Sequence, residues 1–318
     1  MTAGPMTSIL DAIGGTALVE LTRVAPGFDG RLFAKLEHRN PGGSVDDRSA
    51  RAAVERLLRR GDLEPGGTLV IETAASDFAV SAAQVCRARH IQLVCVLDRA
   101  VADRSGALLR AYGARVEVPP DPADSEWARI GYARESAARL GAHWPGPHAE
   151  LRQSQSDPGA LLEIVEQLAG RVDYVICEAG AASVLRGAAE HIAAGALPIR
   201  LIAVDVADAC DDRSPAGPAS TGPASTDPAS TDPSPMPEDP ADDGVHAWFR
   251  VTEAQAAAAC RRLVRREAIL AGPRSGAALA AFERIADRTG AGATVVLLFP
   301  DNGFRHLDTV HSPDQDID

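Results

Sequence analysis

The stretch Asn40–Arg48, which reads NPGGSVDDR, decides how the rest of the chain is interpreted. Its Pro-Gly-Gly run predicts a tight turn, because proline presets one backbone angle and glycine tolerates angles that other residues avoid. An extended segment over 32–40 (LFAKLEHRN) enters this turn. A helical pattern over 47–60, with apolar residues on one face and Gly61 as its stop, leaves it. The sequence therefore predicts a strand, a turn and a helix in succession.

The same alternation of strand and helix continues along the chain. Apolar runs predict buried parallel strands at 68–73, 91–97, 172–177, 200–205 and 294–299. Helical patterns cover 105–112, 253–266 and 275–287. Strands separated by helices predict an α/β fold built on parallel sheets. In such folds ligands bind at the carboxyl ends of the strands, so the loops that leave those ends are the candidate sites.

Composition excludes several kinds of function. The chain has 318 residues and a formal charge of −12, with a single lysine, Lys35, among 32 basic residues. Of this charge, −7 belongs to 211–243 and −4 to 308–318, which leaves the body close to neutral. Without a basic stripe we expect no nucleic-acid binding, and no apolar run approaches the roughly 20 residues of a membrane span. No signal peptide is recognisable, and we expect a cytoplasmic protein.

Two acidic segments and the cysteines complete this picture. Residues 211–243 repeat Pro, Ala, Ser, Thr and Asp, which predicts a disordered loop, and 311–318 forms an acidic tail. The loop is interpreted either as an interaction or phosphorylation segment or as a tolerated expansion of a surface loop. The five cysteines are widely spaced and form no CxxC pair, so we expect reduced thiols and no metal site.

With these features in place, the chain resembles the cysteine synthase and cystathionine β-synthase family, the fold type II enzymes that use pyridoxal phosphate (PLP). The family signature Asn-Pro-Gly-Gly-Ser-Val-Lys-Asp-Arg matches Asn40–Arg48 at eight of nine positions. Further matches follow in order at 13–18, 34–37, 108–114, 269–278 and 300–305. The resemblance implies two α/β domains of the three-layer, tryptophan synthase β-like architecture. It places a smaller domain at 41–143, a larger one at 8–40 and 144–310, and a ligand cleft between them.

The one mismatch in the signature falls on the residue that carries the family's chemistry. The lysine that forms the Schiff base with PLP in the family aligns with Asp46. A Schiff base needs a primary amine, and a carboxylate cannot form one. Lys35 aligns with an ordinary lysine of the preceding strand and is interpreted as a surface or strand residue beside Glu37. The resemblance therefore names no catalytic residue in this chain.

The loop that would hold the substrate differs as well. The family has Thr-Ser-Gly-Asn-Thr-Gly after its next strand, and this chain has Thr73-Ala74-Ala75-Ser76-Asp77-Phe78. Of that loop only Thr73 is retained. Ala74 replaces a serine donor, and Asp77 adds a negative charge where the resemblance places an anion.

The remaining parts of the PLP cradle are vestigial. The family's phosphate loop, Gly-Thr-Gly-Gly-Thr, corresponds to 180–184 (GAASV), in which Gly180 and Ser183 remain and Glu178 precedes. Ser76 stands where the family's asparagine contacts the cofactor. Ser275 matches the serine that binds the pyridine nitrogen, and a second interpretation makes it the N-cap of the helix that follows.

Three functional hypotheses follow. The first is a degenerate homologue without PLP catalysis, acting as a scaffold, a regulator or a partner subunit. For it we expect no bound cofactor, since PLP is implied by resemblance only. We also expect a homodimer, or a heterodimer with an active relative, whose small-molecule ligand the sequence does not identify.

The other two hypotheses keep catalysis. In the second, Asp46, Asp47, Asp77 and Glu178 converge and supply acid–base chemistry or hold a divalent cation; alternatively, Asp47 is structural and the others are solvated. The third is a β-replacement enzyme resembling O-acetylserine sulfhydrylase that uses PLP without a covalent bond.

Overall fold

The computed structural model describes residues 5–120, 126–147, 156–207 and 244–311. The predicted disordered loop at 211–243 lies outside the described residues, as does all of the predicted acidic tail except His311. The chain divides into two compact units. The first comprises 1–17, 37–163 and 181–187, and the second comprises 18–36, 164–180 and 188–318. The predicted domain bounds stay a prediction.

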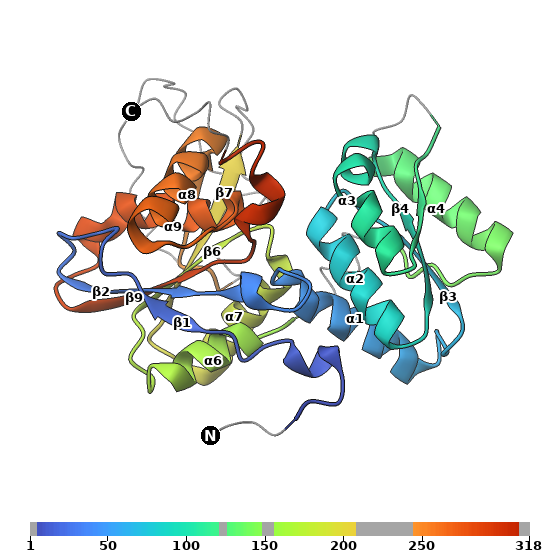
Figure 1. The fold of residues 1–318 in the computed structure, drawn as a ribbon. Coiled ribbons are helices and arrows are strands. Elements are labelled where there is room, and N and C mark those ends of the chain that lie inside the picture. Colours follow the sequence, from blue (N-terminus) through green and yellow to red (C-terminus); the bar gives the residue numbers. More distant parts are fainter. Residues whose placement is uncertain (1–4, 121–125, 148–155, 208–243, 312–318) are drawn as a thin grey trace, which may run out of the picture. The chain divides into compact units, whose positions relative to one another are not determined.

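The first unit is built on a three-stranded parallel sheet in the order β3-β4-β5 (Figure 1). The strands are β3 (Thr68–Glu72), β4 (Gln92–Val96) and β5 (Arg115–Glu117). The helices are η1 (Ile9–Ala12), η2 (Glu37–Arg39), α1 (Asp46–Arg60), α2 (Ser76–Ala88), α3 (Arg99–Ala111) and α4 (Glu126–Leu140).

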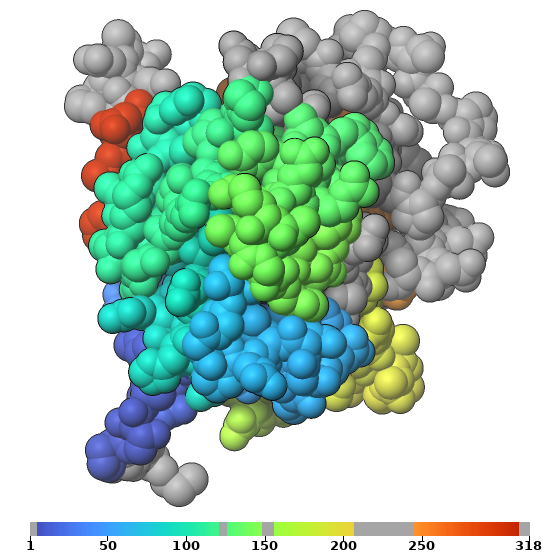
Figure 2. Space-filling model, turned by 90° about the vertical axis from the view of Figure 1, so that its right-hand side faces the viewer, coloured from blue at the N-terminus to red at the C-terminus, as the bar shows by residue number. Residues whose placement is uncertain are grey.

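Helices cover both faces of this small sheet. On one face, residues of α1, α2 and α3 pack with Leu69, Ile71, Leu93 and Cys95 in one apolar cluster. On the other face, Val70 and Val94 pack against Ala133 and Ala137 of α4. Figure 2 looks onto the face of this unit that carries α4, which is green. The alternation of side chains along each strand thus produces three layers.

The second unit is built on a six-stranded sheet in the order β1-β2-β9-β6-β7-β8. Only the pairing of β1 with β2 is antiparallel. The strands are β1 (Leu18–Glu20), β2 (Gly30–Lys35), β6 (Tyr174–Glu178), β7 (Arg200–Ala207), β8 (Ala247–Thr252) and β9 (Ala293–Leu298). Its helices are α8 (Glu253–Glu267), α9 (Pro273–Ile285), η3 (Ala286–Arg288) and η4 (Gly303–His306). Two more helices, α6 (Gly159–Gln167) and α7 (Ala182–Gly195), begin in the first unit and end in the second.

The core of this unit lies between the sheet and two helices. α8 and α9 bury alanine-rich faces and Phe282 against alternate residues of the central strands. The second half of α7 lies on the opposite face of the sheet (Figure 1). The predicted α/β class with parallel sheets is therefore confirmed.

One local expectation was wrong, and of two alternatives for Lys35 one holds. The helix predicted at 105–112 begins six residues earlier, at Arg99, because the side chain of Asp98 accepts a hydrogen bond from Val101 N–H at 2.7 Å and caps it. Lys35 is the last residue of β2, as a strand lysine would be, but its side chain is 0% exposed and so does not lie on the surface. Among the described residues, none of the helices is both long and apolar enough to cross a membrane.

Candidate functional site

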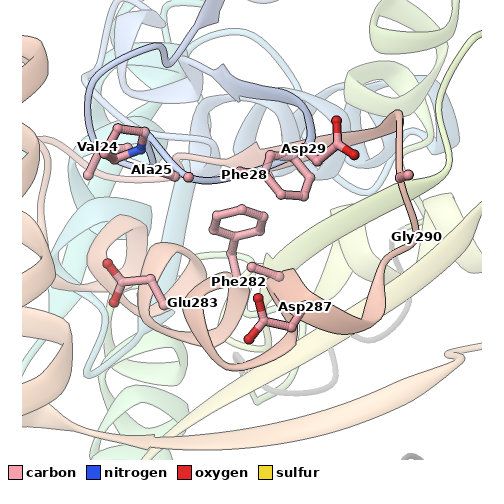
Figure 3. A pocket seen from close by; sticks show the side chains of 12 residues that line it. Val24, Ala25, Phe28, Asp29, Phe282, Glu283, Asp287 and Gly290 are labelled. Carbon is pink, nitrogen blue, oxygen red and sulfur yellow. The ribbon is translucent and has the colours of Figure 1, made fainter.

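A pocket at the amino ends of β2 and β9 has a volume of about 340 Å³ (Figure 3). Phe28 and Phe282 meet edge to face in it, with ring centroids 5.0 Å apart, and Asp29, Glu283 and Asp287 also line it. Ligands of parallel α/β sheets bind at the opposite, carboxyl ends of the strands. This pocket therefore lies at the end of the strands opposite to the one where the sequence predicts ligand binding.

A larger pocket of the second unit, about 770 Å³, lies at the carboxyl ends of β6 and β7. Glu178 ends β6 and lines it, as does Val206 of β7. Its charged and titratable lining residues are Glu178, Glu253, Arg261, Arg274, His306 and Asp308. This is the end of the sheet where the sequence places ligand chemistry, and acidic and basic side chains both face it.

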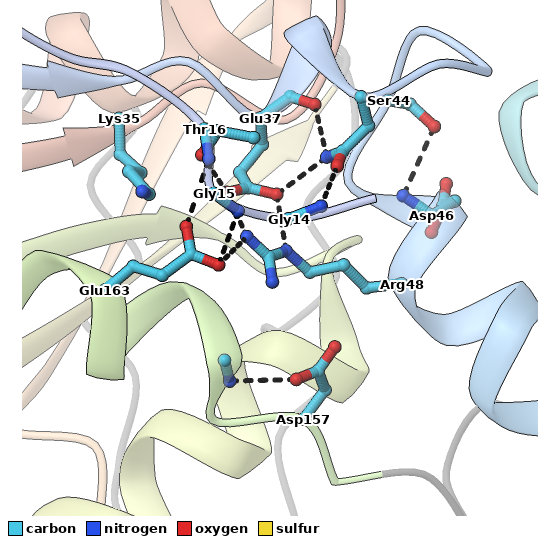
Figure 4. Close-up of polar contacts among 12 residues, drawn as sticks. Gly14, Gly15, Thr16, Lys35, Glu37, Ser44, Asp46, Arg48, Asp157 and Glu163 are labelled. Carbon is cyan, nitrogen blue, oxygen red and sulfur yellow. Dashed lines mark hydrogen bonds and ion pairs between the residues drawn. The ribbon is translucent and has the colours of Figure 1, made fainter. Parts of the chain in front are cut away.

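The signature loop of the first unit, Asn40–Arg48, is held by a buried salt bridge (Figure 4). Nε and Nη2 of Arg48 donate to the two carboxylate oxygens of Glu37 at 2.7 and 2.9 Å. Nη2 of Arg48 also donates to Glu163 at 2.7 Å. Burial by itself would lower the pKa of Arg48, but the hydrogen bonds and charges of Glu37 and Glu163 raise it above its ordinary value. The guanidinium is therefore permanently charged, and its Nε and Nη2 are bound by carboxylates.

Backbone amides and short polar side chains complete this network. Thr16 Oγ1 donates to Glu37 at 2.7 Å, and the amide of Asn40 donates to the same carboxylate at 2.9 Å. The Asn40 side-chain oxygen accepts from Gly14 N–H at 2.8 Å. Glu163 accepts from the N–H groups of Gly15 and Thr16 at 3.0 and 3.2 Å (Figure 4). We call the set Gly14, Gly15, Thr16, Glu37, Asn40, Arg48 and Glu163 the Arg48 network, and its bonds stay within the first unit.

The glycines of the signature are used by the backbone itself. Gly43 has φ +93°, a conformation that other residues rarely adopt. Gly42 N–H donates to the Asp47 carboxylate at 2.5 Å, and a Cβ on Gly42 would collide with that carboxylate. The hydroxyl of Ser81, on α2, donates to the same carboxylate. Asp47 is 0% exposed, and its bonds to Gly42 and Ser81 favour the interpretation of this residue as structural.

Asp46 lies at the start of α1 and is buried, with 2% of its surface exposed. Its N–H donates to Ser44 Oγ at 3.2 Å (Figure 4). A carboxylate in the first turn of a helix interacts favourably with the partial positive charge of that end. Position 46 therefore presents a buried anion at the end of the Pro-Gly-Gly turn.

The predicted substrate loop lies between β3 and α2 of the first unit. Thr73 is buried, and its Oγ1 accepts from Ala75 N–H at 2.9 Å, which shapes the turn. Ala74 is exposed, whereas Ser76 and Asp77, the first residues of α2, are half-buried. Among the described residues, no group of three or more His, Cys, Asp or Glu side chains could hold a metal ion. The geometry gives the divalent-cation hypothesis no support.

The turn after β6 is filled by the side chain of Glu178, the last residue of that strand. Gly180 N–H donates to Oε1 of Glu178 at 2.7 Å, and Nε of Arg274 donates to Oε2 at the same distance. Both side chains belong to the second unit and are largely buried. Ser183 is the second residue of α7, and its carbonyl accepts from Asp157 N–H at 3.0 Å. The sequence marks Glu178 as the residue before the loop, but no pattern in it predicts the pairing with Arg274.

Ser275 is bound to Asp301 and does not cap its helix. The N-cap of α9 is Gly272, and Pro273 occupies the first helical position, as proline prefers. Ser275 Oγ lies 2.7 Å from Oδ1 of Asp301, and the Asp301 carboxylate also accepts from the N–H groups of Arg274 and Ser275. The N-cap interpretation was wrong because Asp301, which follows β9, satisfies the amides that a cap would serve.

Lys35 is held by the second unit. Its Nζ donates to Oε1 of Gln167, the last residue of α6, at 3.1 Å. Cys86, Cys95, Cys177 and Cys260 are buried free thiols, and Cys210 lies outside the described residues.

Comparison with known proteins places these features in context. The sequence profile of the family described as pyridoxal-phosphate dependent enzyme matches residues 9–301. The chain is 34% identical to N-(2-amino-2-carboxyethyl)-L-glutamate synthase of Ralstonia nicotianae over 310 residues, which is 96% of this chain and 89% of that protein.

Solved structures agree on the fold. The crystal structure of O-ureido-L-serine synthase superposes with a TM-score of 0.79 and 26% identity, covering 99% of this chain and 98% of the other. A lysine-to-alanine mutant of that enzyme with O-ureido-L-serine bound superposes with a TM-score of 0.78 and 26% identity. The match covers 99% of this chain and 96% of the mutant. The O-acetylserine-dependent cystathionine β-synthase from Helicobacter pylori superposes with a TM-score of 0.75 and 23% identity, covering 96% of this chain and 99% of the other. At this identity the match supports a shared fold and nothing further.

Proposed function

This chain belongs to the family of pyridoxal-phosphate-dependent enzymes, and on that premise we propose that it is a member without Schiff-base catalysis. The observation that carries the proposal is Asp46. It stands where the family signature has its lysine, is buried at the start of α1, and has no amine with which to form a Schiff base.

Lys35 offers no replacement amine. It is the single lysine of the sequence, its side chain is 0% exposed, and its Nζ donates to Gln167. To attack an aldehyde, this lysine would have to lose its proton and leave that hydrogen bond inside a buried strand end. We therefore infer that no side chain of the described structure is placed to hold PLP covalently.

The charge around the predicted phosphate turn also argues against the cofactor. The Glu178 carboxylate already accepts the hydrogen bond of Gly180 N–H. Its other oxygen is paired with Arg274, so a phosphate in this turn would have to displace the carboxylate from both partners. The residues present therefore do not fit a Schiff-base PLP with its phosphate in this turn, and we assign no reaction step to it.

What the chain retains is a folded scaffold of this enzyme family. The Arg48 network and the apolar cores of both units are built from side chains of this chain. We propose a scaffold, regulatory or partner-subunit role, as a homodimer or as a heterodimer with an active relative.

The proposal is tested by the cofactor content of the full-length protein. Purified protein is incubated with PLP, reduced with borohydride and mapped by mass spectrometry. Because Lys35 and the amino terminus supply the primary amines, any adduct can be assigned to one site. We expect no visible chromophore and no stoichiometric pyridoxyl group, and a stoichiometric adduct on Lys35 of the native protein would overturn the proposal.

The variant Asp46→Lys tests whether the missing lysine at position 46 is the one obstacle to a Schiff base. We expect the variant to remain colourless with PLP, because Glu178 still occupies the phosphate turn. Asp62→Lys, which places a lysine in the exposed segment just after α1, is the matched control for non-specific reaction. A stable chromophore in Asp46→Lys alone would show that position 46 is the one obstacle.

A second candidate function is that of a PLP-dependent synthase that resembles the relatives named above. It is favoured by the 34% identity to N-(2-amino-2-carboxyethyl)-L-glutamate synthase over nearly the whole chain. It requires PLP held without a covalent bond to this protein, in a β-replacement on an activated serine. PLP-dependent product formation by the wild-type chain, absent without enzyme, would establish this candidate over the first. The acid–base hypothesis for Asp46, Asp47, Asp77 and Glu178 stays a prediction.

A further inference from the structure

The turn after β6 carries an internal anion. Glu178 is 8% exposed, and its carboxylate is turned back onto Gly180. A Cβ built on Gly180 would lie 2.8 Å from each oxygen of this carboxylate. The glutamate therefore fills the space in front of this glycine, which is where backbone amides after a strand receive anions in many proteins.

Arg274 neutralises this internal anion. Its Nε donates to Oε2 of Glu178 at 2.7 Å, and the two side chains are 21% and 11% exposed. Its own N–H is fixed by the Asp301 carboxylate at 3.1 Å, at the start of α9. The pair therefore joins the end of β6 to the start of a helix 96 residues further along the chain.

The pair lies on the wall of the larger pocket. Glu178 and Arg274 both line the pocket of about 770 Å³ at the carboxyl ends of β6 and β7. An anion that entered this pocket would find Arg274 already paired with the tethered Glu178 carboxylate, which also accepts from the N–H of Gly180, two residues further along the chain. Tethering gives such a group an effective concentration in the millimolar range or higher, so it outcompetes a weak soluble anion.

We propose that Glu178 is a built-in competitor for anions, which closes this turn to phosphate, and that removing its carboxylate opens a phosphate site made of Gly180 N–H and Arg274. The inference deepens the proposed function, because it accounts for the exclusion of a cofactor phosphate. It rests on Glu178 and not on Asp46, so each can fail alone.

The test uses inorganic phosphate and thermal unfolding of the full chain. Glu178→Ala should be stabilised by about 20 mM phosphate, relative to sodium chloride of equal ionic strength, by about 2–4 °C. The wild-type chain should shift by less than about 1 °C under the same conditions. Glu178→Gln keeps an acceptor for Gly180 N–H without the charge, and should show a smaller gain than Glu178→Ala.

Two further variants control the result. Glu178→Ala combined with Arg274→Ala removes the proposed cation and should lose the phosphate effect. Glu283→Ala removes the acid of an exposed ion pair with Arg262 and should behave as the wild type. If Glu178→Ala does not fold, the Glu178→Gln chain carries the test.

The inference is overturned if phosphate stabilises the wild type as much as the variants, or if both folded variants show no shift. Because no PLP is present, these outcomes are independent of the Schiff-base experiment. A pyridoxyl adduct in the wild type would overturn the proposed function and leave this result standing.

Discussion

The signature loop of the first unit and the turn after β6 of the second unit differ in what their polar groups bind. In the first, the retained residues Asn40 and Arg48 bind other residues of the same chain. In the second, where the family loop is largely replaced, Glu178 binds Gly180 and Arg274. Both regions are thus closed by internal hydrogen bonds, but the first forms them with residues that match the family signature, and the second with a glutamate that precedes a largely replaced loop.

The energetic reason is the cost of an uncompensated buried charge. Glu37 is 0% exposed, and Arg48 is its bidentate partner. Removing one partner of a buried pair destabilises a protein by about 3–5 kcal/mol, whether or not a ligand is present. A residue that contacts only a ligand carries no such constraint once the ligand is dispensable.

The largest expected effect is that of Arg48→Ala. It leaves Glu37 buried without its main counter-charge, and we expect the free energy of unfolding to fall by about 3–5 kcal/mol. Denaturant unfolding measures it, with Arg31→Ala, which breaks an exposed pair with Glu20, as the control at about 0–1 kcal/mol. Equal losses in the two variants would refute the structural role of the Arg48 network.

Arg274→Ala probes the second region by the same measurement. It removes a charged hydrogen bond from Glu178, and we expect a loss of about 1.5–3 kcal/mol, less than for Arg48 because this pair is partly exposed. Arg284→Ala, an exposed arginine of the same helix, is the control. A loss larger than that of Arg48→Ala would break the distinction between the two regions.

Gly42→Ala tests the backbone of the signature loop. The added Cβ would collide with the Asp47 carboxylate, so we expect destabilisation by about 1–3 kcal/mol. Gly27→Ala is the matched control, because a Cβ there meets nothing within 4 Å. If the two variants unfold at the same denaturant concentration, the close approach at Gly42 carries no energetic weight.

The smallest expected effect concerns buried thiols, which belong neither to the signature loop nor to the turn after β6. Burial raises the pKa of Cys86, in the first unit, to about 12, and burial together with the charge of Asp301 does the same for Cys260, in the second. A raised folded-state pKa means that stability is complete below the unfolded value near 9 and is lost as pH rises from there towards 12. At pH 10 each thiol should cost about 1.4 kcal/mol.

This pH effect is measured as a difference. Unfolding free energies at pH 8 and 10 are compared for the wild type, Cys86→Ala and Cys260→Ala. Each variant should lose about 1.4 kcal/mol less than the wild type over this interval. A wild type and variants with identical pH dependence would show that these thiols ionise as readily in the folded chain as in the unfolded one.

Prediction from sequence succeeded where a local pattern decides the structure. The apolar runs marked five of the buried strands, and Asp46–Arg60 ends at Gly61, as its pattern indicates. Prediction failed where a residue far away in the sequence determines what a side chain contacts. Asp301 changed the role of Ser275, and Gln167 gave Lys35 a buried partner. Glu163 was missed altogether, because nothing near it in sequence marks it as a member of the Arg48 network.

What the sequence by itself determined is the alternation of strands and helices, the resemblance to a PLP family, and the presence of a single lysine at position 35. These follow from composition and from patterns within a few residues. Only the tertiary structure decided that Glu178 faces Gly180 and Arg274 and that Arg48 joins Glu37 to Glu163. Hydrogen bonds form over a narrow range of distance and angle, and whether residues 96 or 115 positions apart meet within it depends on the packing of the whole chain.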